Sequence, residues 1–506
     1  MSAVTKPTVF SSDKGRRRRL LLHHNFHAII VGTIALLITI PLWIYLVFYF
    51  PLNPSPHPPL KPFPSILLRD GATSDQHSQI SELPPLISLR HIVFGIASSA
   101  HLWPRRREYV RLWWRSDEMR GDVWLDSDVG VVSSNEDGNC SLPRLRVSED
   151  TSRFRYTNPT GHPSGLRIAR IVTESFRLGY EDVRWFLLCD DDTIVNAENL
   201  MVVLGKYDWR EMVYVGGSSE SHSANTHFSH SMGFGGAGIA ISYPLARALV
   251  DMEDECLERY PMLYGSDDRL HACITEIGVP LFRENGFHQL DIRGNAAGIL
   301  AAHPITPFVS IHHVESLDPL YPGLNSLDSL KLFTKAMTTH THTFLQRSIC
   351  YDRINKLTIS VSLGYVVQVF PDVVLPRELE RSEKTYIAWN KIGRREEFDF
   401  DTRESYSYRS LCRKPVLFFL RDVKRDEGGG NVTIGSYSRL GNAGGDRSEV
   451  MRKIFCFPRW SSSPLLGVQR ITVLGNPLRP NWHLFPRRME CRIQKRNNKL
   501  LILEVG

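Results

Sequence analysis

Three adjacent carboxylates form the densest group of chemically reactive side chains in this chain of 506 residues. Asp190-Asp191-Asp192 directly follows the apolar run 185–189. If that run is a strand, it delivers three negative charges to one edge of a sheet, where a divalent cation relieves their repulsion. Hard oxygen ligands suit Mg²⁺ or Mn²⁺, and either ion can hold a diphosphate. The plain alternative is an acidic turn before a helix, where Asp is favoured in any case.

Three other segments carry residue types able to act beside those carboxylates. The glycines of 233–238 allow the backbone to approach a ligand, although their spacing is not that of a Walker loop or a convincing dinucleotide fingerprint. Ser266-Asp267-Asp268 precedes a helical stretch, so its acids are either proton acceptors or an ordinary helix cap. His312-His313-Val314-Glu315 offers imidazoles, which suit Mn²⁺, but a histidine pair in a loop is the plain alternative.

The elements that must position these residues alternate between strand and helix patterns. Strand-type runs lie at 91–97, 184–190, 212–215, 238–241 and 279–282, and helix-like stretches lie at 164–178, 197–204, 244–256 and 268–277. This order predicts an α/β domain with a mainly parallel sheet, which binds ligands beyond the carboxyl ends of its strands. After residue 350, the strand-like runs 357–370 and 416–420 predict a smaller β-rich module over 351–506.

The N-terminal part predicts a membrane anchor and a stem. Residues 28–50 carry no charge, and at about 1.5 Å per residue they span the roughly 30 Å hydrocarbon core of a bilayer. Because the arginines at 16–19 precede this run, residues 1–27 are expected in the cytosol and the rest of the chain across the membrane. Prolines in 51–87 favour an extended stem. A cleaved signal peptide or a buried core helix is the alternative to the anchor.

The charge and the cysteine content of the chain limit which partners and which cellular compartment are expected. The chain has a net charge of +7, but its first 50 residues hold six basic residues and one acidic residue, which leaves +2 for the remainder. A nucleic-acid partner is therefore not expected. The eight cysteines show no CxxC spacing, so one or two disulfides among the last four are expected rather than a zinc site. Two glycosylation sequons, at 139–141 and 431–433, agree with a lumenal location.

The four motifs occur in a fixed order between residues 190 and 315. In combination they resemble the fringe-type β-1,3-glycosyltransferases of glycosyltransferase family 31, and the overall pattern is most similar to a plant group of uncharacterised fringe-related proteins. The resemblance covers about residues 88–350. It implies the nucleotide-sugar transferase α/β fold called GT-A for this part, behind a single-pass anchor. The anchor and stem are also what Golgi glycosyltransferases look like.

The resemblance implies roles for the carboxylates and the histidines. Asp192 would be the metal-bound carboxylate of a DxD-type motif, and Asp190 and Asp191 would lie near the nucleotide sugar. His313, which precedes Val-Glu, matches the metal-binding histidine of the family, with His312 as the alternative ligand. The ion would be Mn²⁺ or Mg²⁺.

The resemblance also implies which residues lie beside the sugar donor and which residue is the catalytic base. Gly235, Gly236 and Gly238 match the glycine-rich segment beside the donor. The second carboxylate of the acidic motif is the base in the family, which assigns Asp268 to this role with Asp267 beside it. The chain departs from the family after this point, because 269–272 lacks the usual glycine and so leaves the acceptor side and the linkage open.

The expected function is inverting transfer of a hexosyl group from a UDP-sugar to a hydroxyl of a glycan or glycoprotein, through a β-1,3 linkage, in the Golgi lumen. One alternative is a catalytically inactive carbohydrate-binding or scaffold protein on the same fold. Another is a metal-dependent hydrolase, for which paired metal-ligand spacing is missing from the sequence.

Overall fold

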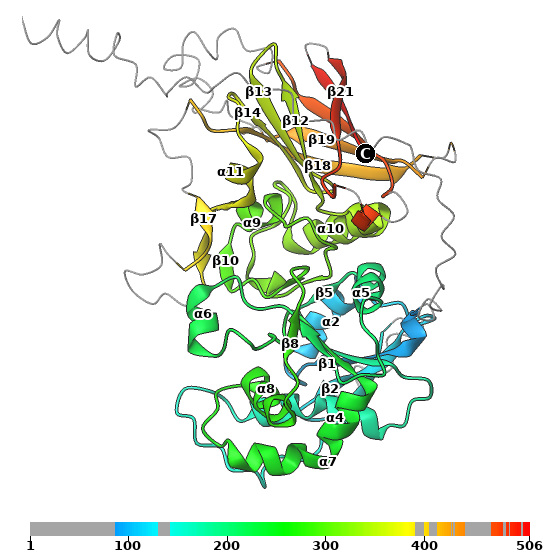
Figure 1. Ribbon diagram of the computed structural model, residues 1–506, viewed down its shortest axis with the longest axis vertical. Coiled ribbons are helices and arrows are strands. Elements are labelled where there is room, and N and C mark those ends of the chain that lie inside the picture. Colours follow the sequence, from blue (N-terminus) through cyan, green and yellow to red (C-terminus); the bar gives the residue numbers. More distant parts are fainter. Residues whose placement is uncertain are drawn as a thin grey trace, which may run out of the picture. The chain divides into compact units, whose positions relative to one another are not determined.

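The computed structural model describes residues 87–129, 142–389, 399–403, 412–426, 428, 431–440, 467–478, 482–484, 486–496 and 499–506 (Figure 1). The expected anchor at 28–50, the segments on either side of it and the sequon at 139–141 lie outside these ranges, apart from Ile87 at the end of the stem. Within the described ranges, no helix combines the length and the apolar character needed to cross a membrane.

A central seven-stranded sheet has the strand order β3-β2-β1-β4-β7-β6-β8. The strands are β1 (Ile92–Ala97), β2 (Arg120–Leu125), β3 (Arg144–Val147), β4 (Trp185–Asp190), β6 (Tyr214–Gly216), β7 (Ile239–Ser242) and β8 (Leu281–Arg283). The first four strands in this order are parallel, β7 is antiparallel to both of its neighbours, and β6 is parallel to β8. The prediction of a mainly parallel sheet is confirmed, with β7 as the reversed strand.

Helices cover both faces of this sheet. They are α2 (Trp103–Arg111), α3 (Ser164–Ala169), α4 (Ile171–Arg177), α5 (Ala197–Leu204), α7 (Tyr243–Arg259) and α8 (Ser266–Ile277). Among the described residues, the short helix α6 (His222–His227) contributes none to the two hydrophobic clusters of the sheet. The helix expected over 164–178 is divided at Arg170, and it ends before Gly179, whose φ of 68° is typical of a glycine that follows a helix. The helix expected over 197–204 is present with those bounds, and the side chain of Asn196 caps it by accepting a hydrogen bond from the Asn199 amide.

The strands that carry the candidate site are buried on both faces. In β1, Phe94 packs in a hydrophobic cluster that contains residues of α2 and α5, whereas Val93 packs with residues of α3, α4, α7 and α8. In β4, Leu187 and Leu188 divide between the same two clusters. Because alternate residues point to opposite faces, a strand with helices on both sides is an unbroken apolar run, which is why β1 and β4 are recognisable in the sequence.

One three-stranded sheet and two two-stranded sheets lie between the central sheet and the C-terminal part (Figure 1). The strands are β5 (Ile194–Val195), β9 (Phe287–His288), β10 (Ile292–Gly294), β11 (Ser310–Ile311), β15 (Ser382–Glu383), β16 (Tyr386–Ala388) and β17 (Thr402–Arg403). β11 pairs with both β5 and β9, and β10 pairs with β16. The helices of this region are α9 (Ala297–Ala301), α10 (Ser326–His340) and α11 (Pro376–Glu380), with the short 3-10 helices η2 (Val314–Ser316) and η3 (Thr341–Thr343). A further 3-10 helix, η1 (Leu89–His91), directly precedes β1 of the central sheet.

The C-terminal part is built on an eight-stranded sheet with the order β12-β13-β14-β18-β19-β20-β22-β21. Its strands are β12 (Arg347–Asp352), β13 (Leu357–Ser362), β14 (Val366–Phe370), β18 (Val416–Arg425), β19 (Thr433–Arg439), β20 (Arg470–Gly475), β21 (Cys491–Arg496) and β22 (Leu500–Val505), with η6 (Trp482–Leu484) before β21. The expected run 357–370 is a hairpin of two strands. The expected division at 350/351 falls inside β12, and one hydrophobic cluster contains Phe94 of β1 together with Val367 of β14.

Disulfides link elements in both parts. Cys350–Cys491 joins β12 to β21, which confirms a disulfide among the last four cysteines, and Cys412 is disulfide-bonded as well. Cys256–Cys273 joins α7 to α8 and was not expected from the sequence. Its cysteines are 17 residues apart in the chain, and only the antiparallel packing of two helices brings them together.

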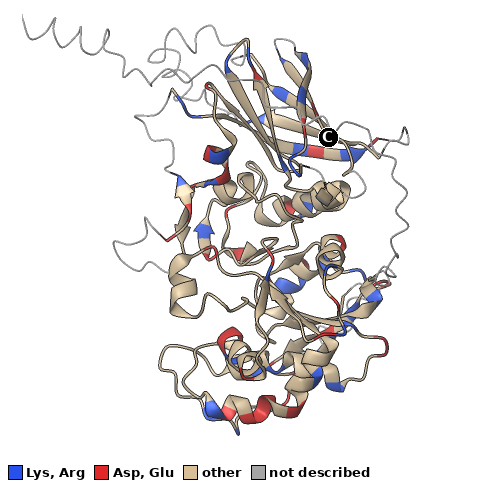
Figure 2. Cartoon of the chain, in the orientation of Figure 1, with Lys and Arg blue, Asp and Glu red and all other residues tan. Residues whose placement is uncertain are grey.

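Acidic residues gather along α7 (Figure 2), and one of them, Glu253, is fully buried. Its Oε2 accepts a hydrogen bond of 2.7 Å from the Thr173 hydroxyl, and its Oε1 has no hydrogen-bond partner in the part of the chain that the structure describes. Burial raises the pKa of Glu253 to about 8. The folded protein therefore carries a neutral carboxyl here at pH 7.

We expect Glu253→Gln to flatten the pH dependence of stability between pH 5 and 8. The unfolded chain releases this proton at a lower pH than the folded chain, so stability falls as the pH rises towards the folded pKa, by at most about 1.4 kcal/mol per pH unit. Urea unfolding at several pH values measures the slope. The exposed Glu255→Gln on the same helix is the control and should leave the slope unchanged; equal slopes for wild type and Glu253→Gln would contradict the assignment.

Candidate functional site

The end of β4 delivers three carboxylates to different surroundings. Asp190 is the last residue of the strand, with a side chain 36% exposed, while Asp191 and Asp192 lie in the turn that follows and are buried. The Asp191 amide donates to the Ala97 carbonyl at the end of β1, so the turn starts where both strands end. The site is therefore at the carboxyl edge of the parallel part of the sheet, as the sequence predicts.

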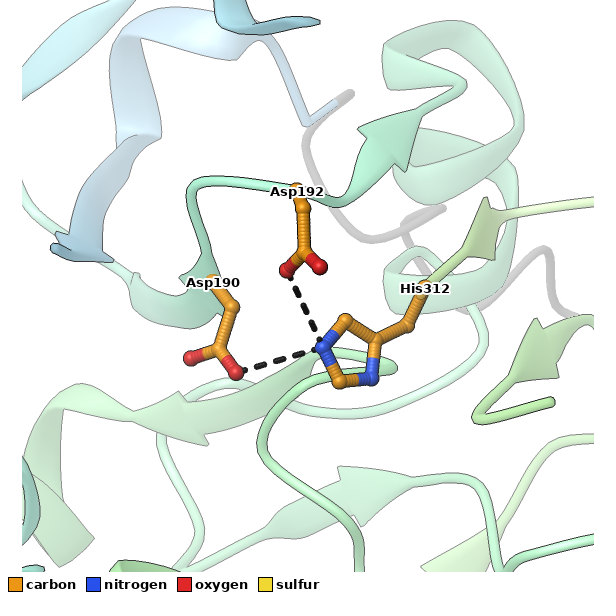
Figure 3. Close-up of side chains that lie close together, drawn as sticks. All are labelled: Asp190, Asp192 and His312. Carbon is orange, nitrogen blue, oxygen red and sulfur yellow. Dashed lines mark ion pairs between the residues drawn. The ribbon is translucent and has the colours of Figure 1, made fainter. Parts of the chain in front are cut away.

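Asp190, Asp192 and His312 come together in a group able to hold a metal ion (Figure 3). Nε2 of His312 lies 3.3 Å from Oδ2 of Asp190 and 3.2 Å from Oδ1 of Asp192. His312 reaches this place because it directly follows β11, and its amide donates to the carbonyl of His288 in β9. The arrangement is DxD-like, with an imidazole as the third donor.

The polar atoms of this group fit a metal ion. Oδ1 of Asp192 is buried, faces the imidazole and has no hydrogen-bond partner among the described residues. Burial alone would raise the pKa of Asp192, but His312 and Arg106 hold it well below its usual range. Burial likewise opposes protonation of His312, yet Asp192 and Asp190 raise its pKa to about 10. An imidazolium thus offsets the two carboxylates here, and a metal ion that displaced its proton would take over that role.

His313 was expected as the metal ligand with His312 as the alternative, and the structure places His312, not His313, with the two carboxylates. His313 has left-handed backbone angles, with φ of 57°, and its ring is turned to the Leu290 carbonyl, 3.3 Å from Nδ1. Its ring stacks on His312 instead of joining the carboxylates. The two histidines point in different directions for a backbone reason. His312 continues the direction of β11 towards Asp192, whereas the left-handed backbone of His313 turns the side chain of His313 away.

Asp191, which was expected near the nucleotide sugar, has both of its carboxylate oxygens bound by neighbouring side chains. Its Oδ2 accepts a hydrogen bond of 2.5 Å from the Ser98 hydroxyl, and its Oδ1 accepts one of 2.8 Å from Arg106. Arg106 also contacts Asp192 at 3.4 Å and donates to Glu315, the last residue of the His-His-Val-Glu motif. Burial raises the pKa of Asp191 to about 6, although Ser98 and Arg106 oppose the shift.

Arg106 was missed in the sequence. Its side chain is only 20% exposed, and it lies on α2, between the carboxylate turn and Glu315. The available signal was the run of arginines at 105–107 soon after the first strand, opposite a group of acids that needs positive charge. Nothing in local spacing indicates which of the three points inward.

The glycine-rich segment borders the site because its backbone lies against two of the functional side chains. A Cβ at Gly236 would stand 2.7 Å from Nε2 of His312 and closer still to its Cε1 and Nδ1. A Cβ at Gly235 would stand 2.5 Å from Oδ1 of Asp267. The Gly236 carbonyl accepts a hydrogen bond of 2.7 Å from the Thr193 hydroxyl, which ties the segment to the carboxylate turn. Gly238 directly precedes β7.

The two carboxylates of the Ser-Asp-Asp motif are placed differently from the expectation. Asp268 folds back onto its own chain and accepts hydrogen bonds of 2.7 Å and 2.9 Å from the amides of Tyr264 and Gly265, so it caps α8. Asp267 lines a small pocket together with Asp190 and Gly235. Burial and the nearby Asp190 carboxylate raise the pKa of Asp267 to about 7. Asp267, rather than Asp268, therefore faces the carboxylates of β4.

The chain belongs to the family described as "Protein of unknown function, DUF604", whose model matches residues 224–491. This family is related to the fringe-like proteins of glycosyltransferase family 31. The matched range includes the glycine-rich segment, the Ser-Asp-Asp motif, the histidine pair and much of the C-terminal sheet. It begins after the carboxylate turn of β4.

We expect Gly236→Ala to weaken metal binding by at least about tenfold, since its methyl group would push the His312 ring away from the carboxylates. The dissociation constant of the purified protein for Mn²⁺, measured by electron paramagnetic resonance, tests this. Gly265→Ala is the matched control, because its backbone is extended and a Cβ there lies 3.9 Å from its nearest neighbour, on Asp268. Equal affinity in wild type and Gly236→Ala would show that His312 is not a ligand.

Proposed function

We propose that this protein is an inverting glycosyltransferase that moves a hexosyl group from a UDP-sugar to an acceptor hydroxyl on a GT-A-like fold. The observation that carries the proposal is the meeting of Asp190, Asp192, His312 and Asp267 at one edge of the sheet. These residues come from three motifs far apart in the chain. The relation of the family to fringe-like glycosyltransferases supports the same reaction class.

Asp190, Asp192 and His312 would hold Mn²⁺ or Mg²⁺, since two carboxylates and an imidazole are ligands that suit Mn²⁺ in particular. A bound ion would supply positive charge to offset the charge that develops on the departing diphosphate. Asp191 would act indirectly, because both of its oxygens are engaged by Ser98 and Arg106 and so hold the turn in place.

Asp267 is the residue we assign as general base. In a single displacement, the acceptor oxygen forms a bond to the anomeric carbon as the bond to the diphosphate oxygen breaks, and the acceptor proton passes to the carboxylate. Asp267 is suited to this because its pKa of about 7 lies near neutral pH and it lines the pocket beside Asp190. Asp268 is less suited, because two backbone amides hold it in the cap of α8 and it does not line this pocket.

The compartment follows from two features. The disulfides Cys256–Cys273 and Cys350–Cys491 agree with folding in an oxidising compartment. The uncharged run 28–50 predicts an anchor that leaves the domain in the lumen. We therefore infer a Golgi membrane protein that acts on glycan or glycoprotein acceptors, through a β-1,3 linkage as the fringe-like relation suggests.

A panel of UDP-sugars incubated with the purified full-length chain tests the reaction class. We expect Mn²⁺-dependent release of UDP from one donor, and we expect Asp192→Ala to reduce this release by at least about a hundredfold, because the ion is no longer held. Circular dichroism checks that the variant is folded. Metal-dependent binding of UDP without turnover of any donor would instead favour a carbohydrate-binding or scaffold protein, and release of inorganic phosphate would favour a hydrolase.

The choice of base is tested by a pair of neighbouring variants. Asp267→Asn should lower the turnover number by about 10²-fold or more, because no carboxylate remains to accept the proton, while the affinity for Mn²⁺ stays unchanged. Asp268→Asn should retain turnover within about tenfold and lose about 1 kcal/mol of stability, because it weakens the cap of α8. The reverse pattern of turnover would restore Asp268 as the base.

A further inference from the structure

The strand β16 brings an aromatic residue of the C-terminal part to the histidine pair. β16 pairs antiparallel with β10, so that Ala388 lies opposite Ile292. The next residue, Trp389, donates its amide to the Asp291 carbonyl at a distance of 2.8 Å. These backbone hydrogen bonds therefore fix the position of the Trp389 main chain, independently of any contact that its ring makes.

The indole continues a stack that ends at the metal group. The rings of Trp389 and His313 are 4.0 Å apart and nearly parallel, at 5°. The rings of His313 and His312 are 3.8 Å apart, at 28°. The guanidinium of Arg293 lies 4.4 Å from the centre of the Trp389 ring, which adds a cation–π contact to the stack. His313 thus contacts an aromatic ring on the side of the C-terminal part and a candidate metal ligand on the other.

His313 is held in a conformation that needs support from its surroundings. Its left-handed backbone, with φ of 57°, costs roughly 1–3 kcal/mol for a residue other than glycine. Its Nδ1 lies 3.3 Å from the Leu290 carbonyl and 3.8 Å from Asp291, whose carboxylate accepts a hydrogen bond from Ser219. Stacking on Trp389 is the contact that holds the face of the ring.

His312 lacks the usual means of orienting a metal-bound imidazole. A metal-binding histidine generally donates its second ring nitrogen to a carboxylate, a carbonyl or water. Nδ1 of His312 is buried and has no such partner from the protein in the described ranges. Packing must orient the ring instead, and the surfaces that do so are the backbone of Gly236 and the stacked ring of His313.

We propose that Trp389 is a positioning residue of the metal centre. It holds His313, and His313 in turn holds His312 against Asp190 and Asp192. The metal centre of the catalytic domain is then completed by a segment that follows residue 350, and the C-terminal part has a role in the reaction as well as in folding. This inference rests on the proposed function, since it concerns the affinity of the same site for its ion.

The test compares Mn²⁺ affinity in full-length variants by electron paramagnetic resonance. We expect Trp389→Ala to bind Mn²⁺ about tenfold more weakly, as is typical when support of a ligand is lost, and Trp389→Phe to recover most of the affinity because a ring remains to stack. Ile387→Ala is the control, since Ile387 lies on β16, just before Trp389, and is 49% exposed. It should bind Mn²⁺ as the wild type does.

The outcomes separate this inference from the proposed function. If wild type binds Mn²⁺, Asp192→Ala does not, and Trp389→Ala binds as wild type does, the role of Trp389 is refuted while the metal centre stands. If Trp389→Ala and Trp389→Phe lose affinity equally and both melt at a lower temperature than Ile387→Ala, Trp389 acts only in folding and the proposal is likewise overturned. If wild type binds no Mn²⁺, the proposed function fails and this inference fails with it.

Discussion

The repulsion among the carboxylates at the end of β4 is the constraint on which the site depends. Asp192 is almost fully buried, and Asp190 lies close enough for both to contact one imidazole nitrogen. Buried like charges are stable only with compensating positive charge. His312 supplies it on one side and Arg106 on the other. The elements around β4 are arranged to bring these two cations to the same turn.

This requirement explains why distant segments converge. α2 contributes Arg106, which joins the carboxylate turn to Glu315, and the strand pairing of β11 with β9 and β5 places His312 opposite. The glycine-rich segment must pass beside His312 without a side chain at Gly236, because a Cβ there would occupy the space of the imidazole. Gly235 likewise leaves room for the side chain of Asp267, which lines the pocket beside Asp190. The arrangement that neutralises the clustered acids is thus also the group of side chains that could hold a metal ion.

The C-terminal part is physically continuous with the part that carries the candidate site. β12 spans the expected division at 350/351, one hydrophobic cluster contains residues from both parts, and β16 adds a strand to β10. A shared core of this kind couples the stability of the two parts, since neither buries its apolar surface fully without the other. The stack from Trp389 to His312 extends that coupling to the site.

Much of the fold was predictable because its signals are local. Strands buried on both faces appear as continuous apolar runs, such as β1 and β4, and the helix α5 is bounded by an Asn cap and a Gly. The division of the expected helix at Arg170 was not predictable. That residue is fully buried in ion pairs with Glu149, Glu174 and Asp254, contacts that depend on the packing of other segments.

The sequence by itself determined which residue types are present and in what order: three acids after a strand, a glycine-rich segment, an acidic helix start and a histidine pair. Only the tertiary structure decided which member of each group faces the site. His312 rather than His313 points inward because His313 has left-handed backbone angles, which turn its own ring away. Asp267 rather than Asp268 does so because Asp268 is held in the cap of α8. Such choices between adjacent residues depend on backbone direction and on which side chains the fold brings near, such as the carboxylates of Asp190 and Asp192 for His312, and local spacing specifies neither.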